Sequence, residues 1–286
     1  MANVHKRVAE NVAGDFFVDA TCIDCDVCRQ IAPSVFRAAR TTSFVHSQPK
    51  SPDERRDALR AIVCCPTGSI GSTGHDDPKT VMGDFPLFVD GPVYFCGFTS
   101  PKSFGGTSYF YRHPAGNWLV DSPKFLPPLV RRLEELGGVS KIFLTHRDDV
   151  ADADRFARHF GARRIIDSRE LNSQPDSEIV LTGDAPSDLG DGFLAIPTPG
   201  HTAGHLCLLA EERFLFTGDH LYWDRDSRQL AGFRNYCESW PRLIESMRLL
   251  AQYSFEWVLP GHGERVYFRR DEMRIQMDRM IAALGN

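Results

Sequence analysis

Three cysteines at three-residue intervals constrain this chain more than any other feature of its sequence. Cys22, Cys25 and Cys28 lie in the segment TCIDCDVCRQIAP, and a fourth cysteine followed by proline, Cys65-Pro66, comes 37 positions later in VCCPTGSI. Four thiolates brought to one point suit a 4Fe-4S cluster. The chain is therefore expected to fold so that a cysteine loop and a distant turn meet around one cofactor.

The pattern resembles that of a ferredoxin with a single cluster. In the bacterial run C-x2-C-x2-C-x3-C-P, the fourth cysteine ligates the other cluster of a two-cluster protein, and Ala32 stands at that place before Pro33 here. The resemblance implies a 4Fe-4S cluster held by the three evenly spaced cysteines and one of the adjacent pair Cys64 and Cys65. The proline that follows favours Cys65.

Three other interpretations compete with the cluster: a structural zinc site, a disulfide framework and unrelated buried thiols. Zinc ligands usually come as two C-x2-C pairs, and three equally spaced thiols followed by C-P do not fit that arrangement. The remaining cysteines, Cys96, Cys207 and Cys237, stand in separate apolar segments. That setting is typical of buried free thiols and favours a reducing compartment.

Length and charge limit the function further. The chain has 286 residues, 42% of them hydrophobic, which suits one smaller and one larger domain. A net charge of -5 gives no electrostatic footprint for nucleic acid or an anionic membrane. No run approaches the ~20 apolar residues of a membrane span, and the N-terminal segment lacks the apolar core of a secretory signal. We expect a cytoplasmic protein, or one of an organelle interior after removal of a transit peptide.

The order of elements predicts two domains, 1–75 and 76–286. A strand at 16–18, the cysteine loop and a charged helix at 52–63 form the first, and the polar, glycine-rich stretch 71–78 is the natural linker. Beyond it, apolar strand segments alternate with amphipathic helical segments, which is typical of an α/β protein. The expected strands are 93–98, 108–111, 118–120 and 141–145, and the expected helices are 129–136, 152–160, 240–253 and 270–284.

Four apolar strand segments of the larger domain end in a residue that can bind a metal. They are IFLTH with His146, PTPGHTAGH with His201 and His205, LFTGDH with Asp219, and WVLPGHGE with His262. Strand ends and the tight turns after them hold side chains rigidly and leave a bound metal open to substrate. Each residue alone is a weak signal, but together they predict a metal site at one rim of a sheet.

From about residue 80 to its C-terminus the chain resembles the metallo-β-lactamase superfamily. The four strand-end segments carry the resemblance, together with FGGTSYF at 104–110 and NWLVDSP at 117–123. The resemblance implies an αββα sandwich, preceded here by a small α+β ferredoxin-like domain, with the metal site at one edge of the two sheets.

The family's first motif, T-H-x-H-x-D-H, is altered in this chain. It keeps His146, has Asp148 in place of the second histidine, and has Val150 and Ala151 where aspartate and histidine are expected. The resemblance implies that His146, His201 and Asp219 bind one metal, that Asp148 adds a carboxylate, and that His262 survives from a second site that has lost two ligands. A shift of the loop would bring in Asp149 and Asp152 instead.

The ligand types favour iron over zinc. Two imidazoles and a carboxylate with open positions match the facial triad of non-haem Fe(II) enzymes, although catalytic zinc accepts a similar set. His205 is expected to support the ligands and not to bind the metal, His220 to point to the opposite face, and Asp121 to be a structural turn residue.

Three functions fit these features. In the first, the cluster passes electrons to a non-haem metal that acts on a small substrate, with a redox protein as a possible donor. In the second, the protein is a metal-dependent hydrolase of a thioester, lactone or amide, with Asp148 or His262 as the general base and the cluster structural or regulatory. In the third, it is a non-catalytic electron-transfer or sensor protein.

Overall fold

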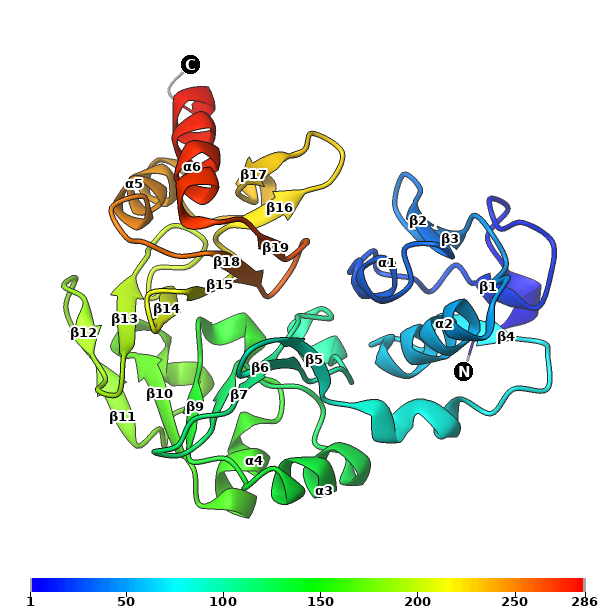
Figure 1. Ribbon diagram of the computed structural model, residues 1–286, viewed down its shortest axis with the longest axis horizontal. Coiled ribbons are helices and arrows are strands. Elements are labelled where there is room, and N and C mark those ends of the chain that lie inside the picture. Colours follow the sequence, from blue (N-terminus) through cyan, green and yellow to red (C-terminus); the bar gives the residue numbers. More distant parts are fainter. Residues whose placement is uncertain (1, 285–286) are drawn as a thin grey trace. The chain divides into compact units, whose positions relative to one another are not determined.

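Two units, each with its own core, make up the chain in the computed structural model, which describes residues 2–284 (Figure 1). The first comprises Met1–Phe110 and Pro123–Gly138, and the second comprises Tyr111–Ser122 and Val139–Asn286. Residues 1, 285 and 286, the outer ends of the two expected domains, lie outside the described part. The boundary near residue 75 stays a prediction.

The N-terminal part of the first unit is a small α+β module around the cysteines. Its elements are β1 (Phe16–Val18), α1 (Val27–Ile31), β2 (Phe36–Ala38), β3 (Ser43–Val45), α2 (Pro52–Cys64) and β4 (Ile70–Ser72). β1 pairs antiparallel with β4, and β2 with β3. Phe16, Phe36 and Ala58 are fully buried in its core. The α+β ferredoxin-like region expected from the sequence is confirmed.

Helix α2 delivers the Cys65-Pro66 turn to that core. It begins where Ser51 accepts a hydrogen bond from the backbone N–H of Glu54 at 3.2 Å, with Pro52 in the first turn. It ends where Cys65 caps it with a backbone bond to Ala61, because Pro66 cannot continue a helix. The end of α2 therefore determines where the Cys65 side chain lies.

The first unit extends well beyond that module. It includes a 3-10 segment (Pro78–Asp84), β5 (Leu87–Asp90), β6 (Val93–Phe95) and α3 (Pro127–Glu135). Two side chains from this later part bind the cysteine turn. The hydroxyl of Thr99 donates to the Cys64 carbonyl at 2.6 Å, and Lys124 Nζ donates to the Pro66 carbonyl at 3.1 Å.

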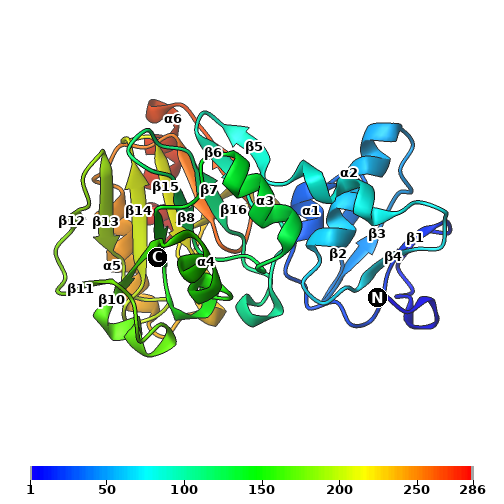
Figure 2. The ribbon, with the colours of Figure 1, turned by 90° about the horizontal axis from the view of Figure 1, so that it is seen from below.

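Two sheets form the centre of the second unit, and β7 (Tyr109–Tyr111) lies at the division between the units. One sheet has parallel neighbours β8 (Trp118–Val120), β9 (Lys141–Phe143), β10 (Arg163–Asp167) and β11 (Ile179–Leu181). The other has the order β12 (Ser187–Asp188), β13 (Phe193–Pro197), β14 (Leu206–Ala210), β15 (Phe214–Gly218), β18 (Trp257–Pro260) and β19 (Val266–Tyr267). Figure 2 shows β13, β14 and β15 side by side.

Aromatic side chains join the two sheets, and helices cover their outer faces. Trp118 stacks on Phe193 with ring centroids 4.1 Å apart, and Tyr111 meets the same ring edge-on at 5.1 Å. Helices α5 (Trp240–Leu250) and α6 (Arg270–Leu284) pack on the six-stranded sheet, and α4 (Ala153–Phe160) packs on β9 and β10 (Figure 1). This helix, sheet, sheet, helix order confirms the expected fold class.

The expected helices match the observed ones closely. The helix expected at 52–63 is α2, and α4 and α6 fall within a residue of their expected ranges. The strands β10, β11 and β14 lie outside the expected strand segments. In the part of the chain that the structure describes, no helix is long and apolar enough to cross a bilayer.

A close approach at Gly105 generates a prediction. Gly105 has φ +91°, and an added Cβ would lie 2.5 Å from the Cβ of Cys25 and 3.1 Å from Cγ of Pro66. Overpacking of this kind costs about 1–3 kcal/mol. Gly105→Ala should therefore lower the thermal midpoint of the first unit and the iron content per chain.

The matched control is Gly190→Ala. Gly190 also has positive φ, +78°, but an added Cβ there meets nothing within 4 Å. It carries the backbone strain without the steric contact, so its iron content should equal that of the wild type. Equal iron content in both variants would contradict the packing argument.

Candidate metal centres

The four expected cluster ligands line one cavity in the first unit. Its walls are otherwise apolar or hydroxyl-bearing, and its lining residues are Val18, Cys22, Ile23, Cys25, Val27, Cys28, Ser43, Cys65, Thr67 and Ile70. Cys64 is fully buried and is not among the residues that line the cavity. The arrangement supports Cys65 as the fourth ligand, as the sequence predicts.

Backbone N–H groups point at two of these sulfur atoms. Ser43 N donates to Cys22 Sγ at 3.4 Å, and Ser69 N donates to Cys65 Sγ at 3.2 Å. Burial raises the pKa of the Cys28 thiol to about 12 and also raises the pKa of Cys25. Cluster binding must therefore displace thiol protons. Hydrogen bonds to sulfur are among the features that set a cluster's reduction potential. Four thiols around one cavity, two of them with backbone N–H donors, fit a 4Fe-4S cluster.

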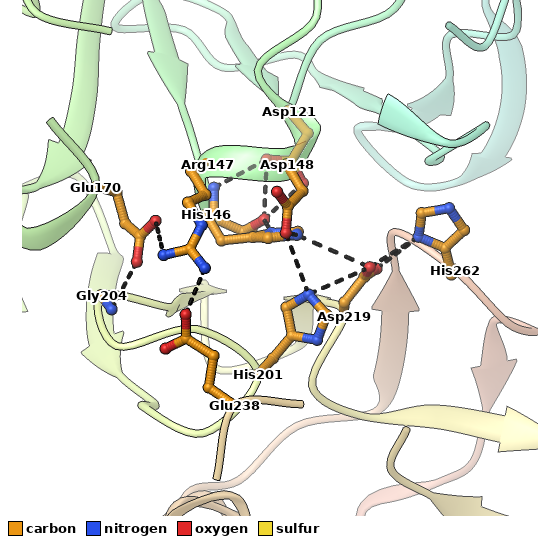
Figure 3. Close-up of polar contacts among 11 residues, drawn as sticks. Asp121, His146, Arg147, Asp148, Glu170, His201, Gly204, Asp219, Glu238 and His262 are labelled. Atoms are coloured by element: carbon orange, nitrogen blue, oxygen red, sulfur yellow. Dashed lines mark hydrogen bonds and ion pairs between the residues drawn. The ribbon is translucent and has the colours of Figure 1, made fainter. Parts of the chain in front are cut away.

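In the second unit, four residues from three strand ends meet around one point (Figure 3). His146 and Asp148 follow β9, His201 follows β13, and Asp219 follows β15. Oδ2 of Asp148 lies 3.8 Å from Nε2 of His146 and 3.7 Å from Nε2 of His201. Oδ2 of Asp219 lies at the same two distances from those nitrogens.

These separations are those of metal ligands and not of hydrogen bonds. Ligand atoms that each lie about 2.0–2.2 Å from one ion are about 3–4 Å from one another. His146, His201 and Asp219 are all buried, and their ligand atoms lie within 4.8 Å of one another. Burial lowers the pKa of His146 to about 4, so its imidazole is neutral, the form that binds a metal. These three groups fit one divalent ion with two imidazole ligands and one carboxylate ligand, and the Asp148 carboxylate lies beside both imidazoles.

Hydrogen bonds behind the site orient His146. The Thr145 hydroxyl lies 3.0 Å from Nδ1 of His146 and 3.0 Å from both carboxylate oxygens of Asp121. Because Nδ1 has this partner, Nε2 is the nitrogen left for the metal, and it has no hydrogen-bond partner in the structure. Asp121 has φ +56° and also accepts from Thr145 N at 2.8 Å. The turn residue expected at 121 thus supports a ligand as well.

A second group of three ligand-type residues shares Asp219 with the first. It consists of Asp149, Asp219 and His262, again with ligand atoms within 4.8 Å. Asp219 Oδ1 lies 2.8 Å from Nδ1 of His262. Both carboxylate oxygens of Asp149 are buried without a hydrogen-bond partner, and burial, with the nearby Asp219 charge, raises its pKa well above the usual range. A buried carboxylate without donors is stabilised by a cation.

The second group differs from the main expectation that the altered motif leaves His262 as the survivor of a second site that has lost two ligands. Asp149 takes a place that the motif comparison left empty at Val150 and Ala151, as the shifted-loop alternative allows. The short 3-10 turn at Arg147–Asp149 sends Asp148 toward the two histidines and Asp149 toward His262. Asp152 belongs to neither group, and its carboxylate lies 3.6 Å from Arg155.

The remaining buried histidines lie behind the ligands. The ring of His205 is 5.2 Å from that of His146, and its Nδ1 lies 2.8 Å from the Thr198 hydroxyl. His220 packs 5.3 Å beyond His205. Among the described residues neither joins a ligand group, which agrees with the expectation that His205 does not bind the metal.

Comparisons with known proteins give two family matches. Residues 18–72 match the 4Fe-4S single cluster domain of ferredoxin I, and residues 103–262, more than half of the chain, match the metallo-beta-lactamase superfamily. The hydroxyacylglutathione hydrolase of Citrobacter koseri is 31% identical over 110 residues, 37% of this chain and 43% of that protein. That of Salmonella paratyphi B is 32% identical over 106 residues, 36% and 42% of the two chains. The chain thus spans about two fifths of these curated relatives.

Solved structures show the same fold at low identity. VMB-1 has a TM-score of 0.52 at 16% identity and covers 69% of this chain and 94% of its own. A metallo-beta-lactamase family protein from Thermus thermophilus has a TM-score of 0.50 at 19% identity, with coverage of 68% and 79%. The chemotaxis sensor ODP, in a structure with a peroxy diiron species, has a TM-score of 0.50 at 18% identity, with coverage of 70% and 94%.

The two adjacent cysteines provide one test of the cluster site. Cys65→Ala should abolish the visible absorption of the cluster, because it removes a thiolate that lines the cavity. Cys64→Ala is the matched control and should keep it, since Cys64 lies outside the cavity lining. Absorption spectra and acid-labile sulfide per chain measure both. A full cluster in Cys65→Ala would show that the ligand assignment is wrong.

Asp149 provides a test of the second group. Asp149→Asn keeps the shape of the side chain and removes its charge, so it should lower the metal content of the second unit by about one equivalent. Asp152→Asn should leave the content unchanged, because Asp152 belongs to neither ligand group. Metal analysis of chains with equal sulfide content measures both. Loss of metal in Asp152→Asn but not in Asp149→Asn would show that Asp152, and not Asp149, faces the site.

Proposed function

The chain belongs to the metallo-beta-lactamase superfamily, and from this premise we propose that it is a metal-dependent hydrolase of a small acyl substrate, fused to a 4Fe-4S ferredoxin-like region. The observation that carries the proposal is the shared carboxylate of Asp219, which faces two ligand groups at once. Such a carboxylate suits a pair of metal ions, the arrangement of many hydrolytic sites. The names of the partial relatives point to the same chemistry.

In this proposal His146, Asp148, His201 and Asp219 hold one ion, and Asp149, Asp219 and His262 hold a second. Bound there, the ions would polarise a carbonyl oxygen and lower the pKa of a water molecule. The donors are imidazole nitrogens and carboxylate oxygens, which suit zinc and iron alike. Iron remains our proposal on ligand type.

Asp148 and His262 are the residues proposed to move protons. The Asp148 side chain is 41% exposed, whereas those of His146, His201 and Asp219 are at most 11% exposed. Its contact with His201 holds the pKa of Asp148 below its usual range, so it is a carboxylate at neutral pH and can accept a proton. His262 can move a proton only where it does not bind the second ion, because its Nδ1 contacts Asp219 and Nε2 is the only other ring nitrogen.

We propose a thioester as the first substrate class to test, with lactones and amides as alternatives. Asp148→Asn should lower kcat/KM by about 10²–10⁴-fold, the usual contribution of a general base. Asp154→Asn is a matched control, because Asp154 forms an exposed ion pair with Arg158 on α4. A panel of acyl thioesters with release of free thiol as the signal measures the effect. Full activity in Asp148→Asn, with metal retained, would contradict its role.

A second candidate function rests on the match at residues 18–72. The cluster would then supply electrons to the metal centre, and a redox protein would be the donor. The two functions differ in their response to reduction. A hydrolase should turn over equally with an oxidised or dithionite-reduced cluster, whereas an oxidoreductase should reoxidise the reduced cluster when substrate is added, as followed by EPR.

A further inference from the structure

Arg147 stands between two metal-site residues and binds neither of them. It lies between His146 and Asp148 in the chain, and Figure 3 shows its guanidinium group turned away from the site, between the carboxylates of Glu170 and Glu238. Nη1 lies 3.7 Å from Glu170 Oε2, and Nη2 forms an ion pair with Glu238 Oε1. The guanidinium thus bridges two carboxylates from distant parts of the chain.

Glu170 binds the loop that carries His201. It belongs to a 3-10 segment (Ser168–Ser173) that follows β10, and its side chain is fully buried. Glu170 Oε1 accepts a hydrogen bond from the backbone N–H of Gly204 at 2.7 Å. Glu170 Oε2 has no hydrogen-bond donor, so the charge of Arg147 is its compensation. Gly204 leaves no room for a side chain, since an added Cβ would lie 2.6 Å from Glu170 Cγ.

Glu238 binds the other end of the same loop. Its backbone N–H donates to the His201 carbonyl at 3.0 Å, and the next residue, Ser239, donates to the Gly200 carbonyl at 2.9 Å. Its side chain pairs with Arg147. The two carboxylates that meet Arg147 therefore belong to the two segments that hold the loop from Gly200 to Gly204.

We propose that Arg147 is a positioning residue that ties the turn carrying His146 and Asp148 to the loop carrying His201. The inference rests on the proposed metal centre and deepens it. His146 and Asp148 on the turn and His201 on the loop reach one ion only if the turn and the loop stay at a constant separation. The planar guanidinium, with donors on both Nη atoms, can span two carboxylates, whereas the ammonium of lysine is a single point charge.

The same geometry argues against a substrate-binding role for Arg147. Both of its terminal nitrogens already face carboxylates, so an anionic substrate would have to displace Glu170 or Glu238. Removal of Arg147 would also leave the buried Glu170 carboxylate without a compensating charge. The expected consequence is a looser ligand set and weaker metal binding, not a change in substrate affinity.

The test is a zinc competition against a chromophoric chelator, performed on anaerobically purified full-length protein with its cluster. Zn²⁺ is the probe for the His146, His201 and Asp219 site. Arg147→Gln should weaken zinc binding by about 10–100-fold, the usual effect of losing a residue that orients metal ligands. Arg147→Lys should restore part of the affinity, because it can pair with only one carboxylate. Cluster absorption should be equal in all variants.

Arg158→Gln is the matched control. Arg158 is an exposed arginine that pairs with Asp154 one turn away on α4, so the same substitution there should leave zinc affinity unchanged. If Arg147→Gln does not fold, Glu238→Gln replaces it in the test. That variant keeps the backbone bond to His201 and loses only the ion pair, and it too should bind zinc more weakly.

The outcomes separate this inference from the proposed metal centre. Zinc affinity equal to wild type in Arg147→Gln or in its replacement overturns the positioning role, and so does a rise in KM at unchanged zinc affinity. If wild-type protein and His201→Ala bind zinc equally, the metal centre itself is wrong and the inference falls with it. Weaker binding in Arg147→Gln, partial rescue by lysine and an unaffected control would support it.

Discussion

The carboxylate of Asp219 is the element on which the second unit depends. It is almost fully buried, and its two oxygens face three imidazoles, those of His146, His201 and His262. Burial alone would raise its pKa, but the charge and hydrogen bond of His262, the largest opposing causes, help to lower it overall. A buried carboxylate charge needs several compensating groups around it. The strand ends that carry the three histidines are therefore constrained to one rim.

The need to compensate the Asp219 charge also limits the positions that the surrounding side chains can take. Thr145 and Asp121 determine which nitrogen of His146 faces the site, and Arg147 contacts Glu170 and Glu238. Asp149 adds a carboxylate that finds no donor within the described protein. The carboxylates of this site repel one another. Bound cations would compensate their charges.

The sequence predicts the parts of this arrangement that follow from local pattern. The histidines and Asp219 come directly after apolar strands, so their meeting at a rim could be inferred from the order of segments. The sequence offers Asp149 only as an alternative ligand, because a motif comparison counts positions and does not show which way a 3-10 turn directs adjacent side chains. No motif or spacing in the sequence indicates a role for Glu170 or Glu238. Their role depends on tertiary contacts with Gly204 and His201, which no spacing in the sequence records.

The contacts of the cysteine turn have a consequence for how such a protein can be divided or recombined. Thr99, Gly105 and Lys124 come from beyond the glycine-rich linker, yet they contact Cys64, Cys25 and Pro66. A gene fusion that joined a ferredoxin to a lactamase-type enzyme at that linker would bring together two surfaces that had evolved separately. In this chain the residues on the two sides of the linker fit one another. An exchange of either half would therefore have to carry the matching side chains of the other with it.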